Sequence, residues 1–264
     1  MPAFDRYRPL DFDGATVLVS GADRGLGRGV ASAFATAGAR VWILSETEAA
    51  LEAADELAAE HGARVHGLLA DVTSPRELEE ALGFVEGLDV LVSNAGIELR
   101  TPLADTDPAL ADAFRRTLEV NVVGCENLVR AALPVLVDGG RIIVTSSIWG
   151  KSAAPGFSAY SASKHALIGL VRAWARELGE RAITVNAVCP GWVRTEASMR
   201  SLASMAAHAG RPEASLLQDI LGAQAIGGLM EPADIASTYL FLASRLADSI
   251  TGQAITVDRG ELLS

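Results

Sequence analysis

Short apolar runs alternate with longer amphipathic segments along almost the whole chain, and this alternation restricts the fold more than any other feature. The runs are rich in β-branched residues at consecutive positions, which is typical of strands buried on both faces of a parallel sheet. They span residues 16–20, 40–45, 65–70, 90–96, 141–147, 183–191 and 254–258. Since parallel strands are joined by crossover helices, the pattern predicts an α/β protein with one doubly wound sheet of about seven strands.

The segments between the runs have apolar residues at helical spacing. Two such sets are Val30, Ala33, Phe34 and Ala37, and Leu167, Leu170, Val171 and Trp174. No low-complexity linker interrupts the alternation, so we expect a single domain over residues 1–264. Residues 196–225 depart from it, are rich in Ala, Ser and Met, and are expected to form a helical flap above the sheet.

The charge balance excludes some classes of function. The 264 residues include 22 Lys and Arg against 33 Asp and Glu, for a net charge of −11, and half of them are hydrophobic. Such a hydrophobic content is typical of a folded protein. An acidic chain without Lys/Arg runs lacks the clustered positive field that phosphate backbones require, so we expect no nucleic-acid partner.

Cysteine usage and the N-terminal residues predict a cytoplasmic location. Cys125 and Cys189 lie far apart, and the four His show no metal-ligand spacing with them, which favours two reduced thiols and no metal. The N-terminal segment, residues 1–14, carries charges where a secretory signal needs an apolar core. No stretch of about 18 apolar residues occurs, so we expect no membrane span.

A glycine-rich turn follows the first predicted strand. Its residues are Ser20, Gly21, Ala22, Asp23, Arg24, Gly25, Leu26 and Gly27. Gly21 permits a sharp turn, Gly25 lets the backbone approach a pyrophosphate, and Gly27 allows close packing of helix on strand. Free N–H groups at the start of the following helix would face the phosphates. On the first strand of an α/β chain, this turn favours a dinucleotide site over a mere tight connection.

Two further motifs carry candidate proton chemistry. Tyr160 and Lys164 are four residues apart and therefore share one helix face. A neighbouring ammonium favours the phenolate and lowers the pKa of a tyrosine from its usual value near 10. Ser147 ends a predicted strand, at the edge where doubly wound folds bind ligands. Alternation along that strand lets only one of Ser146 and Ser147 face the cleft.

In this order and spacing the motifs make the chain resemble the short-chain dehydrogenase/reductase family over about residues 12–260. The matching positions are Gly21, Gly25, Gly27, Asp71, Val72, Asn94, Ala95, Gly96, Asn121, Ser147, Tyr160, Lys164, Pro190, Gly191 and Thr195. The resemblance implies a Rossmann-type domain that transfers a hydride between a nicotinamide cofactor and a substrate. Departures are Ser20 for the usual Thr, Ser93 for the first Asn of the Asn-Asn-Ala-Gly motif, and Arg259 for a C-terminal Gly.

The resemblance also implies a role for each catalytic position. Tyr160 would be the general acid/base, and Lys164 would lower its pKa and bind the nicotinamide ribose. Ser147 would polarise the substrate carbonyl or alcohol. Asn121 would hold a water in a proton relay to Lys164.

Cofactor contacts are implied at three groups of positions. The glycine-rich turn with Asp23, Arg24 and Leu26 would meet the pyrophosphate. The adenosine would meet Ser45, Glu46, Asp71, Val72, Asn94, Ala95 and Gly96, and the nicotinamide half would meet Pro190, Gly191, Val193 and Thr195. Glu46 would repel the 2′-phosphate of NADP, so we expect NAD, with NADP as the alternative because Arg24 is basic.

The substrate is expected to be a small or medium secondary alcohol or ketone. Trp149 and Trp192 follow Ser147 and Gly191 and either line the substrate cleft or pack the flap onto the core. The family resemblance implies a homotetramer. Three alternatives remain open: an NADPH-dependent ketoreductase, a non-catalytic dinucleotide sensor, and a sugar-nucleotide epimerase or dehydratase, which usually has a longer C-terminal part.

Overall fold

A computed structural model describes residues 10–62 and 64–263, so residues 1–9 of the N-terminal segment discussed above lie outside the described part. One parallel sheet organises the chain, with strand order β3-β2-β1-β4-β5-β6-β7. The strands are β1 Thr16–Ser20, β2 Arg40–Ser45, β3 Val65–Leu69, β4 Leu88–Ser93, β5 Leu136–Thr145, β6 Thr184–Pro190 and β7 Ala254–Val257. This confirms the predicted doubly wound α/β fold of the Rossmann type.

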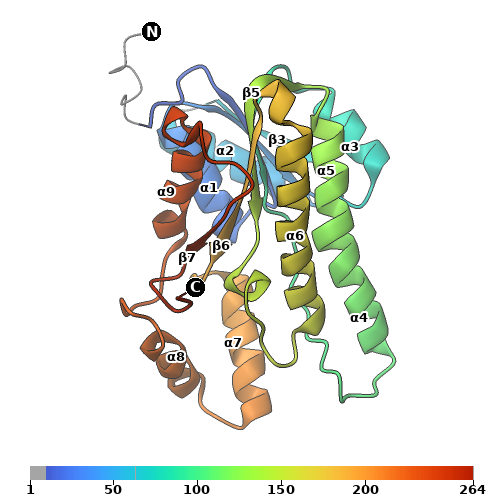
Figure 1. The fold of residues 1–264 in the computed structure, drawn as a ribbon, viewed down its shortest axis with the longest axis vertical. Helices are drawn as coiled ribbons and strands as arrows, with labels where there is room; N and C mark the ends of the chain where they lie inside the picture. Colours follow the sequence, from blue (N-terminus) through green and yellow to red (C-terminus); the bar gives the residue numbers. More distant parts are fainter. Residues whose placement is uncertain (1–9, 63, 264) are drawn as a thin grey trace.

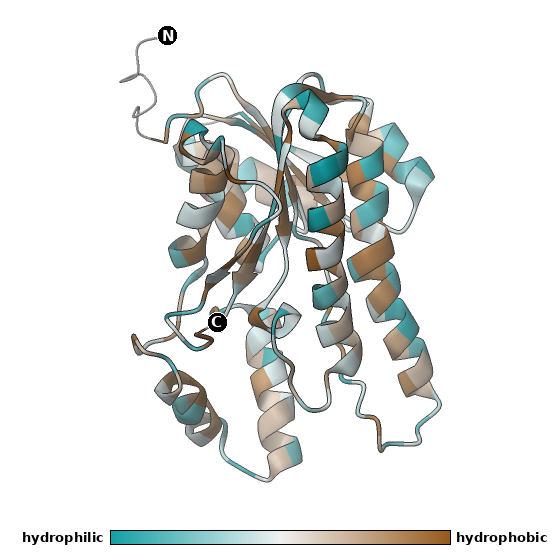
Figure 2. Ribbon diagram, in the orientation of Figure 1, coloured by the Kyte–Doolittle hydropathy of each residue, from teal (hydrophilic) through white to brown (hydrophobic). Residues whose placement is uncertain are grey.

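Helices cover both faces of the sheet (Figure 1). One face carries α1 Gly25–Thr36, α2 Ala49–His61 and α9 Pro232–Ala243, and the other carries α3 Pro75–Leu82, α4 Ala109–Leu118, α5 Gly124–Ala132 and α6 Ser158–Glu177. The apolar helix positions explain this arrangement. Val30 and Phe34 on α1 are fully buried on the first face, and Leu167 and Val171 on α6 are buried on the second. Figure 2 shows the strands as largely hydrophobic, while hydrophilic residues mark the outer turns of the helices.

The sheet order reverses beside β1, whose neighbours are β2 and β4. The crossover connections therefore leave in opposite directions there, and the loops after β1 and β4 separate at the carboxyl edge. In open α/β sheets this separation forms the crevice in which ligands bind. The topology thus places a candidate site before any side chain is considered.

A π-helical turn, Glu119–Val123, joins α4 to α5 and makes one long helix of the two. Turns of this kind add a residue to a helix and are frequent at functional sites. Here the turn carries Asn121, whose side chain is buried.

The fifth strand differs from its expected bounds of 141–147. β5 begins at Leu136 and ends at Thr145, and its pairing with β4 shifts register between Leu88 and Val90. The exposed pair Asp138 and Gly139 forms part of this irregular stretch, which explains why an apolar pattern did not indicate it. Ser146 and Ser147 consequently lie just beyond the strand.

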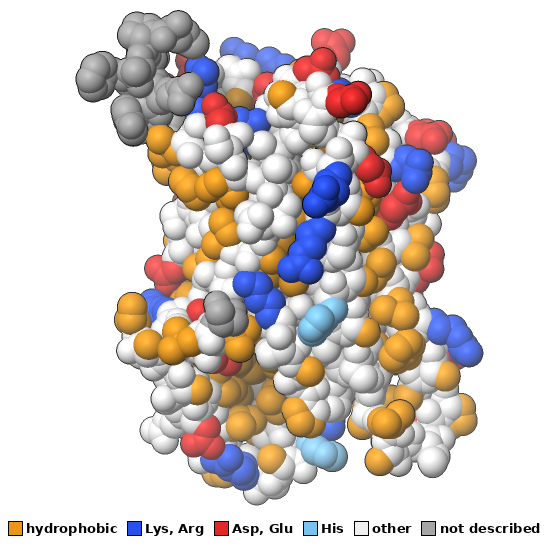
Figure 3. Space-filling model, in the orientation of Figure 1, with side chains coloured by type: hydrophobic (Ala, Val, Ile, Leu, Met, Phe, Trp, Pro, Cys, Tyr) orange, Lys and Arg blue, Asp and Glu red, His pale blue; other side chains and the backbone are white. Residues whose placement is uncertain are grey.

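Residues 196–225 form two helices, α7 Glu196–Ala209 and α8 Glu213–Gly222, which lie beyond the carboxyl edge of the sheet (Figure 1). Thr195 caps α7 by accepting a hydrogen bond of 3.2 Å from the backbone N–H of Ser198. On the face shown in Figure 3, hydrophobic side chains gather around this end of the molecule. Among the described residues, no helix is both long and apolar enough to cross a bilayer.

Candidate active site

A cleft of about 350 Å³ opens at the carboxyl edge of the sheet, where the strand order reverses. Every residue expected from the sequence to contact cofactor or substrate lines this cleft. Of the four expected catalytic residues, Ser147, Tyr160 and Lys164 line it, and Asn121 lies behind its wall. Residues from positions 21 to 198 are thus brought together by the ends of six strands, β1 to β6, by α4 and α6, and by the start of α7.

The glycine-rich turn has the geometry that a pyrophosphate requires. Gly21 and Gly25 have φ values of +60° and +58°, which favour glycine. A Cβ atom on Gly27 would lie 2.1 Å from the carbonyl oxygen of Gly21, so this position tolerates no side chain. A Cβ atom on Gly25 would meet nothing closer than Thr195 at 3.6 Å, so the backbone there is open to the cleft.

The start of α1 is available to an anion. The side chain of Arg24, the N-cap residue, makes no hydrogen bond to the first turn of α1. That turn, which the structure describes in full, contains no acidic residue. No side chain of the first turn therefore competes with an anion for its N–H groups and for the positive end of the helix dipole. The residues present fit a dinucleotide.

Ser20 and Asn94 connect the glycine-rich turn to the end of β4. The Ser20 hydroxyl accepts hydrogen bonds from the backbone N–H groups of Asn94 and Ala95, at 3.0 and 3.1 Å. The Asn94 amide in turn donates to the carbonyl oxygens of Ser20 and Gly21. Serine in place of the family's threonine therefore keeps the hydroxyl that fixes this connection.

Ser147, Tyr160 and Lys164 meet on one wall of the cleft. The Ser147 hydroxyl lies near enough to the Tyr160 phenol to lower its pKa. The Lys164 ammonium lies 5.4 Å from the centre of the Tyr160 ring. Ser146 points away from the phenol, since its hydroxyl donates to the carbonyl oxygen of Lys164 at 2.9 Å. Of the two adjacent serines, Ser147 is the one that faces the tyrosine.

Burial sets the protonation of this group. Burial, together with the charge of Glu98, raises the pKa of Tyr160 well above its ordinary value, although the Ser147 hydroxyl opposes the shift. Burial lowers the pKa of Lys164 to about 8. Near neutral pH the phenol therefore holds its proton and most of the lysine is an ammonium.

Asn121 fixes the loop that follows β4. Its side-chain oxygen accepts from the backbone N–H of Ile97 at 2.8 Å, and its amide donates to the Ile97 carbonyl and to the Ser163 hydroxyl. The same oxygen lies close to the backbone of Gly96, as does the Lys164 ammonium. The side chain thus joins the π-helical turn, the loop after β4 and α6.

At the adenosine end of the cleft lies an arginine that the sequence patterns did not indicate. Arg116 on α4 lies 3.6 Å from Asp71 and 4.0 Å from Glu46. Burial alone would raise the pKa of Asp71, but hydrogen bonds from Thr73 and the Arg116 charge lower it. Arg116 lies on a helix, far in sequence from any strand end, and no motif marks such a position. This explains why the sequence did not indicate it as a site residue.

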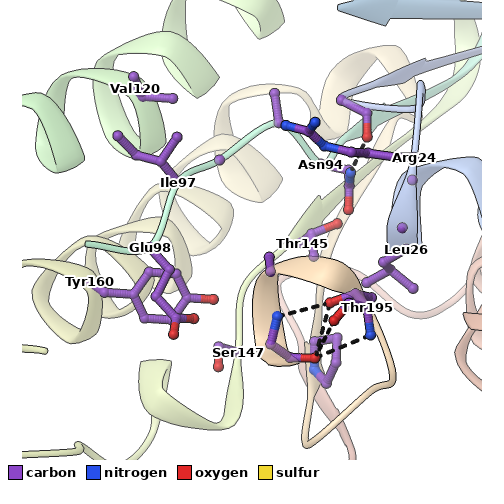
Figure 4. A pocket seen from close by; sticks show the side chains of 18 of the residues that line it. Arg24, Leu26, Asn94, Ile97, Glu98, Val120, Thr145, Ser147, Tyr160 and Thr195 are labelled. Carbon is purple, nitrogen blue, oxygen red and sulfur yellow. Dashed lines mark hydrogen bonds between the residues drawn. The ribbon is translucent and has the colours of Figure 1, made fainter. Parts of the chain in front are cut away.

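Glu98 is the second lining residue that was missed. It follows Gly96 by two residues in the loop after β4, and in the view of Figure 4 its side chain lies over the Tyr160 ring. Burial raises the pKa of Glu98, while the Ser201 hydroxyl on α7 and the Lys164 charge oppose the shift. Glu98 follows the Asn94-Ala95-Gly96 motif at the end of a strand, and this position could have marked it as a site residue.

Aromatic rings line the substrate region next to Tyr160. The Trp149 ring lies edge-on to the rings of Tyr160 and Trp192, with centroid distances of 5.8 and 6.2 Å. Trp192 is 7% exposed, and both tryptophans line the cleft. The substrate region therefore combines an apolar wall with the polar group of Ser147, Tyr160 and Glu98.

Comparisons with known proteins agree with this geometry. A family model described as Enoyl-(Acyl carrier protein) reductase matches residues 21–261. D-beta-hydroxybutyrate dehydrogenase of Cupriavidus necator is 32% identical over 257 residues, which cover 94% of this chain and 98% of that protein. The 3-oxoacyl-[acyl-carrier-protein] reductase FabG of Aquifex aeolicus is 33% identical, with 95% and 98% covered.

A crystal structure of 3-oxoacyl-[acyl-carrier protein] reductase from Brucella melitensis superimposes with a TM-score of 0.85 at 30% identity, and the match covers 100% of this chain and 97% of that one. The fold and the cleft define a dinucleotide-binding α/β enzyme. The chain belongs to the short-chain dehydrogenase/reductase family, as the motifs predicted, and it is an NAD(P)-dependent oxidoreductase of that family.

Proposed function

We propose that the protein transfers a hydride between NAD(H) and a small secondary alcohol or ketone, with Tyr160 as the general acid/base. The observation that carries this proposal is the meeting of Ser147, Tyr160 and Lys164 on one wall of the cleft that also receives the start of α1. A non-catalytic dinucleotide sensor would have no use for this group.

The cleft offers a separate set of residues to each part of the cofactor. Gly21, Gly25 and the N–H groups of α1 would hold the pyrophosphate. Pro190, Gly191, Val193 and Thr195 line the end where the nicotinamide would lie, within reach of Tyr160. When bound, the nicotinamide supplies the hydride chemistry, and the protein supplies position and one proton.

The chain's own residues handle that proton. The Ser147 hydroxyl is placed to donate to the substrate oxygen and hold it against the Tyr160 phenol. In the reducing direction, the protonated phenol donates its proton to that oxygen. In the oxidising direction the phenol must first lose its proton, and the Lys164 ammonium stabilises the phenolate. Asn121 fixes the adjoining loop and would hold a water beside Lys164.

Charge at the adenosine end favours NAD. Glu46 and Asp71 line that end, and a 2′-phosphate there would meet two carboxylates. Arg116 and Arg24 also line it and would attract a phosphate, which keeps an NADPH-dependent ketoreductase as the second candidate. Because Arg116 already lies beside both carboxylates, we infer that its charge is largely compensated.

The assembly and location expected from the sequence are part of the same proposal. The family resemblance supports a homotetramer. Cys125 and Cys189 are free and buried, which agrees with a reducing compartment such as the cytoplasm.

The test of the function is a spectrophotometric screen of secondary alcohols and ketones, with NAD(H) and NADP(H) in parallel. We expect turnover with a small secondary alcohol or its ketone, and a higher kcat/KM with NAD(H). Failure of every member of the panel with both cofactors would contradict the proposal.

A further inference from the structure

We propose that Glu98 is a substrate-binding carboxylate that selects neutral alcohols carrying a second hydroxyl next to the reacting carbon, and rejects substrates that carry a carboxylate. The inference rests on the proposed function, because it places the reacting oxygen at Tyr160. It goes further by naming the feature that the substrate must carry.

The position of Glu98 is the first observation. The residue lines the same cleft as Ser147 and Tyr160, and in the view of Figure 4 its side chain lies over the Tyr160 ring. The two groups are close enough for the Glu98 charge to act on the phenol. A substrate whose oxygen lies between Ser147 and Tyr160 therefore has its adjacent carbon within reach of Glu98.

The remaining hydrogen-bonding capacity of Glu98 is the second observation. An ionised carboxylate has about four acceptor sites. The Ser201 hydroxyl on α7 and the Lys164 ammonium lie near enough to Glu98 to lower its pKa. These two neighbours leave acceptor sites free on a carboxylate that lines the cleft, and a carboxylate can use such sites only with a donor such as a hydroxyl or an ammonium.

The aromatic lining of the cleft is the third observation. Trp149 and Trp192 present an apolar surface beside Tyr160, with Phe157 5.2 Å from the Trp149 ring. A substrate with hydroxyls on one side and hydrocarbon on the other satisfies both the carboxylate and the aromatic lining. A short-chain hydroxy acid does not, because its carboxylate would lie against Glu98 in a partly buried site.

This assignment predicts a different substrate class from that of a relative whose name states its substrate. D-beta-hydroxybutyrate dehydrogenase is named for a hydroxy acid, and the present cleft has a carboxylate where such an acid would be repelled. A vicinal diol, or the α-hydroxyketone made by oxidising it, has the required donor and no charge. An amino alcohol offers the same donor chemistry from an ammonium and serves as a second arm of the test.

The test compares ligands with one carbon skeleton: butane-2,3-diol, butan-2-ol, 3-aminobutan-2-ol and 3-hydroxybutyrate. In the wild-type protein we expect kcat/KM for the diol to exceed that for butan-2-ol at least about tenfold, with 3-hydroxybutyrate the poorest, since a site built to bind a hydroxyl rejects analogues that lack it. In Glu98→Ala and Glu98→Gln, the diol advantage should shrink to within about threefold and 3-hydroxybutyrate should gain relative to butan-2-ol.

Two controls separate this role from a structural one. Glu86→Gln changes an exposed glutamate away from the cleft and should keep the wild-type ratios. Ser201→Ala leaves the Glu98 carboxylate but removes the neighbouring hydroxyl on α7, so we expect the diol preference to persist. Loss of the preference in Ser201→Ala but not in Glu98→Gln would overturn the inference, because Glu98 would then only tether the flap.

Calorimetry in the Tyr160→Phe protein distinguishes this inference from the proposed function. That variant lacks the transferable proton but keeps Glu98, so diol binding to its NAD complex can be measured without turnover. We expect Glu98→Ala in this background to weaken diol binding at least about tenfold relative to butan-2-ol binding. An unchanged ratio of diol to butan-2-ol affinity would overturn the role of Glu98, even if the wild-type protein turns over the diol. Absence of all turnover in the wild-type protein would count against the proposed function alone.

Preference of the wild-type protein for 3-aminobutan-2-ol over the diol would show that Glu98 selects an ammonium rather than a hydroxyl. That result would overturn the diol assignment.

Discussion

The Lys164 ammonium donates a hydrogen bond of 2.8 Å to the backbone carbonyl oxygen of Thr145, the last residue of β5. This bond holds a 4% exposed lysine at the base of the cleft, beside the Tyr160 ring. A buried ammonium with one backbone acceptor is poorly compensated, which explains why burial lowers the pKa of Lys164 to about 8. The lysine therefore lowers the stability of the fold at neutral pH.

The first prediction concerns that loss of stability. Well below pH 8 the lysine is protonated in both states, and its burial opposes folding by about 3 kcal/mol, from a pKa of 10.5 in the unfolded chain and about 8 in the folded one. The loss disappears as pH rises toward 10.5, because the unfolded chain then also loses the proton.

Urea unfolding of wild type and Lys164→Met across pH 7 to about pH 9.5 measures this effect. The free energy of unfolding of the wild type should rise relative to that of the variant as pH increases. A difference that stays constant with pH, or that moves in the opposite direction, would show that the lysine has an ordinary pKa in the folded protein.

The second prediction links Glu98 to the pH profile of alcohol oxidation. The reaction needs the deprotonated Tyr160 phenol, so kcat/KM should rise with pH until that group has ionised. The Glu98 charge raises the pKa of Tyr160, and Glu98→Gln removes that charge. The rising limb of the variant should therefore lie at lower pH than that of the wild type. An unmoved limb would mean that the two groups do not interact in the cofactor complex.

The third prediction is cofactor choice. Two like unit charges about 4 Å apart repel by up to about 4 kcal/mol at the effective dielectric of a protein surface, before salt reduces the value. Glu46 is largely exposed, so its effect on a 2′-phosphate is smaller than this limit. We expect higher kcat/KM with NAD than with NADP, a smaller or reversed ratio in Glu46→Arg, and a larger ratio in Arg116→Ala. A wild-type preference for NADP of about tenfold or more would show that Arg24 and Arg116 hold the phosphate and that Glu46 does not oppose it.

The fourth prediction is the homotetramer. The family resemblance implies subunit contacts through the helices that contain residues 104–132 and 158–179. Phe114 on α4 and Val123 in the π-helical turn lie in the first of these and are 37% and 42% exposed. Light scattering at micromolar concentration should give about four chain masses, and Phe114→Glu should reduce that mass. Phe84→Glu changes a 71% exposed phenylalanine after α3 and serves as the matched control. A single 27.5 kDa species in the wild type would contradict the prediction.

The strands could be predicted from sequence because their burial on both faces leaves a continuous apolar run. The predicted run 65–70 corresponds to β3, Val65–Leu69, and 183–191 contains β6, Thr184–Pro190. Strand order and the π-helical turn around Asn121 could not be predicted in this way. They depend on packing between segments far apart in the chain, which no local pattern records.

The candidate site shows the same division. Residues at strand ends, such as Ser147 and Asn94, could be placed because the fold brings strand ends together. Arg116 reaches the cleft from the middle of the protein's long α4–α5 helix, and its neighbours Glu46 and Asp71 follow other strands. Arg259 has a φ of +56°, which explains the glycine usual in the family, and its side chain donates to the Gly227 carbonyl and lies 3.5 Å from Asp234.

The assignment of Tyr160 is tested most directly by comparing Tyr160→Phe with the wild type on the best alcohol of the panel. Only the transferable proton is lost, so we predict that turnover falls by about 100-fold or more, while NADH affinity, measured by fluorescence titration, stays nearly unchanged. A Tyr160→Phe enzyme that retains more than about a tenth of wild-type turnover would contradict the role of Tyr160 as general acid/base.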